Sequence, residues 1–365
     1  MDKKFVNDIP FLTLKYVKSL EKEDRFQYHP FKENLSFYGT NLSLGFSCYA
    51  LKIYYMTLEY KNLSEKELTS WGTFIKSFHS STNIDQLFID PIYLKYYSKK
   101  LSRESIRSSS KTIQNFLFNS NLETKNKRLL KGLNAESKQS IATLYELGVK
   151  ELPRVYSFNN YDKEVIGYLE QLNWEFPWSA GAQFSSYCVY SKTQDLELEG
   201  KLLKFINNKV DKNTGSYFTK HPKNNREIIN GAMKVITGLD WLGADIHYPE
   251  KLIDFCIDNK PTLEGCDVVD YVYVLYKCSL QTTYKKLEIN NIFHELLEEL
   301  LKLFHKSSGG FSYFQNKSQD YYYGVPLGKG GNQADLHGTI LCLWALIMIL
   351  ENTELNTENF NVIKP

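Results

Sequence analysis

The stretch that decides the fold is IFHELLEELLKLF, residues 292–304. Its apolar residues recur at i, i+1, i+4, i+5 and i+8, with Glu298 and Lys302 among the charged residues between them. A period near 3.6 residues places the apolar side chains on one helix face and the charged ones on the opposite, solvated face. Similar stripes occur over 165–172 and 228–239. We therefore expect amphipathic helices along much of the chain.

A second kind of helix is indicated by residues 268–280 and 340–350, which are apolar nearly all round. Such helices are buried on most sides. The alternation of striped and uniformly apolar helices is typical of an outer and an inner ring, and convincing strand alternation is absent from the sequence. The predicted fold is all-α, an α/α toroid of about six helix pairs.

No linker rich in glycine and serine divides the 365 residues, so we expect a single toroid domain over 1–365. Residues 102–138 are polar and rich in Lys, Ser and Asn, which indicates an insertion or a surface segment. A weak repeat places a turn and an aromatic pair at 86–90, 215–219 and 309–314. Small residues near several helix starts, as at Gly231 and Gly338, indicate close packing or space for a ligand.

Composition excludes several classes of protein. Lys+Arg 44 against Asp+Glu 42 gives a net charge of +2, which offers no electrostatic basis for nucleic-acid binding. The six cysteines show no pairing pattern, which favours a reducing compartment. The N-terminus lacks the apolar core of a signal peptide, and residues 340–350 are too short to span a membrane. We expect a cytoplasmic protein without an integral membrane segment.

The first candidate site follows the glycine-rich residues 328–331, where Asp335 and His337 precede an apolar helix. A carboxylate and an imidazole two residues apart could coordinate a metal or share acid–base work. The alternative is structural, because an aspartate at this position can cap the free N–H groups of the helix.

The second candidate is the acidic start of the other uniformly apolar helix, the one over 268–280. Glu264, Cys266, Asp267 and Asp270 cluster there. Asp267 and Asp270 are spaced i, i+3 and so share one helix face. The helix dipole alone favours acidic residues in a first turn. Capping accounts for one of these aspartates more readily than for two, since the helix that follows is expected to be buried.

The third candidate surrounds Trp174 and Trp178, with Glu175 between them and Gln183 in the helix that follows. Exposed tryptophans at a pocket mouth stack on sugars or apolar ligands, whereas buried ones fill the core. We expect Trp174, Trp178, Gln183 and Asn230 to contact the substrate.

The C-terminal third resembles a known family. Gly265-Cys266-Asp267 before an apolar helix, Gly309-Gly310-Phe311, and Asp335-Leu336-His337-Gly338-Thr339 followed by Cys342-Leu343-Trp344 look like the end of the terpenoid cyclase and protein prenyltransferase toroids. The resemblance implies an α/α toroid with zinc ligands at Cys266, Asp267 and His337. In triterpene cyclases of this fold, a D-x-D-D motif donates the proton, and here the corresponding stretch runs from Asp267 to Asp270.

Three functions follow as hypotheses. The leading one is an enzyme that uses Asp267, Asp270, Asp335 and His337 for acid–base chemistry on an isoprenoid-like or other apolar, cyclic substrate. The second is an enzyme acting on saccharides in the same toroid, with two carboxylates and tryptophan platforms. The third is a helical scaffold without catalysis. We expect no cofactor and any zinc to be weakly bound, because the neighbouring Cys266 and Asp267 point about 100° apart on a helix.

Overall fold

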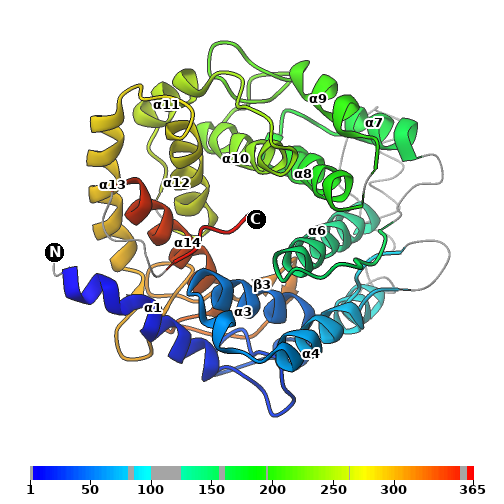
Figure 1. The fold of residues 1–365 in the computed structure, drawn as a ribbon, viewed down its shortest axis with the longest axis vertical. Coiled ribbons are helices and arrows are strands. Elements are labelled where there is room, and N and C mark those ends of the chain that lie inside the picture. Colours follow the sequence, from blue (N-terminus) through cyan, green and yellow to red (C-terminus); the bar gives the residue numbers. More distant parts are fainter. Residues whose placement is uncertain are drawn as a thin grey trace.

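The computed structural model describes residues 3–80, 86–99, 125–155, 161–194, 196–262, 264–353 and 360–365, which are mostly helical. Six helices follow one another around the molecule, each packed against the next, and the last packs against the first (Figure 1). They are α3 (Leu44–Met56), α6 (Lys125–Glu146), α8 (Pro177–Thr193), α10 (Asn225–Leu242), α12 (Cys266–Ser279) and α14 (Leu336–Asn352). We call them the central helices.

A second set of helices lies outside the central ones in Figure 1. Each member packs against one or two central helices: α1 against α3 and α14, α4 against α3 and α6, α7 and α9 against α8, α11 against α12, and α13 against α12 and α14. Their bounds are α1 (Lys3–Lys18), α4 (Glu65–Lys76), α7 (Tyr161–Gln171), α9 (Glu199–Asn207), α11 (Pro249–Asp258) and α13 (Lys286–Leu301). The shorter elements are α2 (Phe37–Asn41), η1 (Glu59–Asn62) and a helical segment over 91–99.

The uniformly apolar helices and the striped helix α13 occur where the sequence predicted them. The stripe expected over 228–239 instead belongs to the central helix α10, where every residue of that range except Lys234 is buried. In α12 and α14, buried side chains occupy every side of the helix, as their uniformly apolar sequences predict. In α13, by contrast, the buried residues Ile289, Phe293, Leu296, Leu297 and Leu300 form one stripe. The prediction of a mostly helical chain is therefore confirmed, and none of the helices in the described ranges is long and apolar enough to cross a membrane.

Two small antiparallel hairpins precede α14. Strand β1 (Phe304–His305) pairs with β2 (Gly310–Phe311), and β3 (Tyr321–Tyr322) pairs with β4 (Val325–Pro326). The backbone N–H of Phe311 donates to Thr339 Oγ1 at 3.0 Å, which fixes the first hairpin to α14. This connection brings residues 312–335 to the starts of α12 and α14.

Residues 360–365, which we call the C-terminal strap, cross the other ends of the central helices (Figure 1). The N–H of Asn361 donates to Met56 O at the end of α3, at 2.9 Å. The N–H of Lys364 donates to Glu146 Oε1 of α6, at 3.0 Å. Trp241 Nε1 of α10 donates to Pro365 O, at 2.9 Å. The strap therefore joins three central helices at the ends opposite to Cys266 and Asp335.

One expectation about the chain needs correction. Residues 125–138, assigned above to a polar insertion, form the first part of the central helix α6. Leu133, Asn134, Glu136 and Ser137 are buried there, because the polar side chains of this helix face other helices instead of solvent. Asn134 Nδ2, for example, donates to Gln183 Oε1 at 2.8 Å. The rest of the expected insertion, residues 102–124, lies outside the described residues.

Candidate functional site

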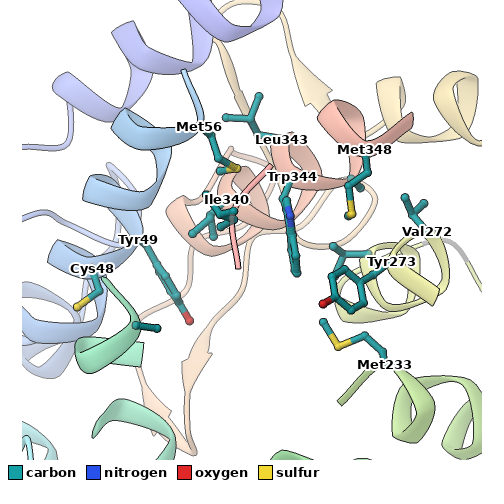
Figure 2. Packing of buried hydrophobic residues seen from close by; sticks show 14 of the residues in the cluster. Cys48, Tyr49, Met56, Met233, Val272, Tyr273, Ile340, Leu343, Trp344 and Met348 are labelled. Carbon is teal, nitrogen blue, oxygen red and sulfur yellow. The ribbon is translucent and has the colours of Figure 1, made fainter. Parts of the chain in front are cut away.

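A cavity of about 950 Å³ lies among the central helices, a size that fits a small-molecule substrate. Its walls include the aromatic residues Tyr49, Tyr168, Trp178 and Trp344. Figure 2 shows Tyr49 of α3 and Trp344 of α14 beside the space between the helices. The ring of Trp344 packs on Tyr273 of α12 at 5.1 Å between centroids. Aliphatic side chains such as Leu172, Val269 and Ile340 make much of the remaining wall.

Asp335 is buried and caps α14. Its Oδ1 accepts from the N–H of Gly338 at 2.7 Å, and its Oδ2 accepts from the N–H groups of Tyr313 at 2.8 Å and Gln319 at 3.1 Å. Burial raises the pKa of Asp335 to about 7, and these N–H groups oppose the rise. Because both oxygens are engaged by the backbone and neither faces the cavity, the structure assigns Asp335 to the capping alternative and not to acid–base work.

Tyr313 joins the starts of α12 and α14. Its carbonyl accepts from the N–H of Gly265 at 2.7 Å, and its hydroxyl donates to Cys266 Sγ at 3.0 Å. Gly265 has φ +61, and a Cβ there would overlap the Tyr313 ring, so both the conformation and the close approach require glycine. Gly338 lies equally close to the Tyr313 backbone. The two candidate motifs, far apart in the sequence, therefore meet through one tyrosine.

His337 lines the cavity between two tyrosine rings. Its ring stacks on Tyr49 at 5.1 Å and lies 5.0 Å from the ring of Tyr313. Burial lowers the pKa of His337 to about 4, and the charge of Lys234 adds to the shift. Its buried Nδ1 has no hydrogen-bond partner within the described part of the chain. The imidazole is therefore neutral at physiological pH, and no carboxylate of the described residues pairs with it to make it a base.

Asp267 connects α12 to α10. Both of its oxygens accept from Arg226 Nε, Oδ1 at 2.8 Å and Oδ2 at 2.6 Å, and Oδ1 also accepts from Asn230 Nδ2 at 2.8 Å. The guanidinium of Arg226 lies 4.8 Å from the ring centre of Trp178, within cation–π range. Asp267 and Asn230, both predicted to act on a substrate, instead hold two central helices together outside the cavity wall.

Asp270 stands one turn further into α12, at the wall of the cavity. Its side chain is 1% exposed, and neither of its oxygens accepts a hydrogen bond from any described residue. Lys234 Nζ of α10 lies 3.8 Å from Oδ1. Burial raises the pKa of Asp270 to about 6, although Lys234 opposes the rise. A carboxyl group with a pKa this close to neutrality can both accept and donate a proton in a reaction.

The side chains that the family resemblance implies as zinc ligands do not fit a metal site. Burial raises the pKa of Cys266 to about 11, so this residue is a neutral thiol that accepts from Tyr313. Asp267 is paired with Arg226, as described above. Over the described ranges, no three His, Cys, Asp or Glu side chains are placed to hold one ion. We derive no step that uses a metal.

The two tryptophans of the third candidate site lie in different environments. Trp178 is half-buried and lines the cavity, as predicted. Trp174 is 1% exposed, donates Nε1 to Leu169 O at 2.9 Å and packs on Phe205. Gln183 is buried and accepts from Asn134 and Tyr168. The prediction that Trp174 and Gln183 contact a substrate does not agree with these positions, because both point into helix–helix contacts.

Sequence reasoning missed the lysines of the cavity wall, which are Lys52, Lys131, Lys138 and Lys234. The signal was present for two of them. Lys52 interrupts the apolar run of α3, and Lys234 interrupts that of α10. A charged residue inside a buried helix is costly, so it usually has a partner or a function. Lys131 and Lys138 lie in a polar stretch that gives no such signal.

No protein-family model, curated protein sequence or solved structure matches this chain.

Proposed function

We propose that the protein is an enzyme of α/α-toroid architecture that carries out acid–base chemistry on an apolar or cyclic, isoprenoid-like substrate held in the central cavity. The cyclic order of the central helices, with α14 packed on α3, supports the toroid. This is also the architecture that the resemblance to terpenoid cyclases and prenyltransferases implies. The buried apolar part of the cavity wall, around Asp270, strengthens electrostatic interactions with a reacting group.

The observation that carries the proposal is Asp270. It is a buried carboxyl group that accepts no hydrogen bond from the described residues, at the wall of a cavity lined by aromatic and aliphatic side chains. Its pKa of about 6 means that the protonated and ionised forms are both available at physiological pH. In this proposal Asp270 exchanges a proton with the substrate, and Lys234 stabilises the ionised form. Tyr49, Trp178 and Trp344 enclose the apolar body of the substrate.

The alternative of a saccharide substrate has weaker support. Glycoside hydrolysis requires two carboxyl groups across the sugar, and Asp335 was the expected partner of Asp270. The oxygens of Asp335 are occupied by three backbone N–H groups. The cavity wall also offers long stretches of aliphatic surface, which sugar hydroxyls do not favour.

The test compares product formation by the wild type and Asp270→Asn. Purified protein is incubated with a panel of acyclic and cyclic isoprenoids and, in parallel, with polysaccharides, and products are detected by mass spectrometry. Loss of a general acid or base lowers the rate by roughly a hundredfold or more. Asp254→Asn, on the outer helix α11, is the matched control and should keep full activity. Turnover of a panel isoprenoid that is unaffected by Asp270→Asn, or turnover of saccharides alone, would contradict the proposal.

A further inference from the structure

The cavity wall has an unbalanced charge. Among the described residues that line it, four are lysines and two are carboxylic acids. The lysines are Lys52, Lys131, Lys138 and Lys234, and the acids are Glu227 and Asp270. A surplus of positive charge in a largely apolar cavity is unfavourable unless something neutralises it. The surplus contrasts with the chain as a whole, whose net charge is only +2.

Three of the lysines have acidic or polar partners. Lys131 Nζ donates to Ser179 Oγ at 2.9 Å. Lys52 Nζ lies 3.4 Å from Glu146 Oε2 and donates to Lys364 O in the C-terminal strap at 2.8 Å. Lys234 Nζ lies 3.8 Å from Asp270 Oδ1. The ammonium groups of Lys52 and Lys234 are therefore positioned by the protein, on α3 and on α10.

Lys138 of α6 differs from these three. No ion pair or hydrogen bond joins its Nζ to another described residue, and its side chain borders the cavity. Burial lowers its pKa well below the ordinary lysine value, and the charges of Lys234 and Lys52 lower it further. The electrostatic influence of both neighbours places Lys138 in one cationic group with them. An anion entering the cavity would oppose this lowering and favour the charged form of Lys138.

We propose that Lys138, with Lys52 and Lys234, binds an anionic group of the cavity's ligand, a carboxylate or a phosphate. Lysine ammonium groups donate to either of these. The aliphatic and aromatic walls fit an apolar remainder, so the ligand is an acidic amphiphile. This assignment rests on the proposed function in taking the cavity as the substrate site, but anion binding can be measured without turnover.

The experiment is calorimetric titration of the protein with two probes, inorganic phosphate and octanoate, which separate the two sources of negative charge. The wild type should bind at least one probe, with an affinity that falls as salt is added. Lys138→Met should weaken binding roughly tenfold or more. Lys66→Met removes an exposed lysine of α4 and should leave the affinity unchanged. Titration in two buffers of different ionisation heat should show net proton uptake on binding, because the anion opposes the lowering of the Lys138 pKa.

Two further variants keep the outcomes distinct. Asp270→Asn should lose turnover and still bind the anion, so failure of the proposed function leaves the lysine site standing. If Lys138→Met does not fold, as judged by circular dichroism, Lys138→Gln replaces it. The absence of binding of both probes to the wild type would overturn the proposal. Equal affinity of wild type and the Lys138 variant would do the same.

Discussion

Helices α12 and α14 begin in similar ways and use their first acidic side chains differently. Both follow a glycine-containing loop, both become apolar, and Tyr313 touches the start of each. At α14, Asp335 uses both oxygens on backbone N–H groups. At α12, Asp267 binds Arg226 while Asp270, one turn later, has no hydrogen-bond partner among the described residues. Similar acidic helix starts therefore contain carboxylates that bind structural groups and, in Asp270, one that accepts no hydrogen bond from the described residues.

The largest expected effect is on the capping aspartate. Asp335→Ala leaves three buried N–H groups without an acceptor, so it should lower the free energy of unfolding by roughly 3–5 kcal/mol. Asp335→Asn keeps one acceptor oxygen, so its free energy of unfolding should lie between those of Asp335→Ala and the wild type. Urea denaturation followed by circular dichroism measures both. A decrease in the free energy of unfolding of less than about 1 kcal/mol for Asp335→Ala would contradict the structural role of Asp335 that distinguishes the start of α14 from that of α12.

The neighbour of that cap should make the fold sensitive to acid. The pKa of His337 is about 4 in the folded protein, so the unfolded chain binds a proton first as the pH falls. The stability that neutral His337 contributes is fully present above about pH 6.5. As the pH falls from 6.5 to 4, the free energy of unfolding decreases by about 3 kcal/mol through this group. His337→Phe preserves the ring stack and cannot be protonated. Relative to this variant, the wild type should lose that amount between pH 6.5 and pH 4, as measured by denaturation at each pH.

Protonation of Asp270 should change the free energy of unfolding with pH by a similar amount and in the opposite direction. Its pKa is about 6 in the folded protein, so the folded state binds the proton more tightly. The wild type therefore loses about 3 kcal/mol through this group as the pH rises from 4 to 6. Asp270→Asn has no such loss, and its free energy of unfolding should rise relative to the wild type by that amount over the same range. A pH-independent difference would place the Asp270 pKa near its ordinary value.

The smallest effect is expected at the other aspartate of α12. The side chain of Arg226 is 46% exposed, so its pair with Asp267 is partly screened by solvent. Arg226→Met should lower the free energy of unfolding by about 1 kcal/mol, and less in 1 M salt. Lys302→Met removes an exposed pair on α13 and serves as the control, with a change close to zero. A loss as large as that of Asp335→Ala would mean that Asp267 is as structural as Asp335.

The helical character of the chain could be predicted because it depends on the pattern of neighbouring residues. The apolar period of α13 and the uniform apolarity of α12 and α14 each depend on a few adjacent turns. Residues 125–138 could not be placed in the same way. Their polar side chains are satisfied by partners such as Gln183, which is 49 residues away from Asn134. Composition alone gives such a helix the pattern of a surface segment.

The candidate site could be predicted in its members better than in their roles. Asp270, His337 and Trp178 do line the cavity. The separation of Asp335 from Asp270 depended on which backbone N–H groups lie nearby, and those of Tyr313 and Gln319 belong to a loop of no regular pattern. The difference between the two tryptophans depended on tertiary packing, because Trp174 precedes α8 and packs against Leu169 and Phe205, whereas Trp178 lies on α8. Neither property is encoded in the adjacent residues.

The C-terminal strap and the contact of α14 with α3 have a consequence for the order of folding. Asn361 meets Met56, and Lys364 meets Lys52, across a separation of roughly three hundred residues. Contacts of such high sequence separation form late, because the entropy of closing the loop must be overcome first. During synthesis, α3 through α12 can assemble by neighbouring contacts, but α3 retains an unpaired flank until residues 336–365 have left the ribosome. The earliest central helix to be made is thus the last to be completed.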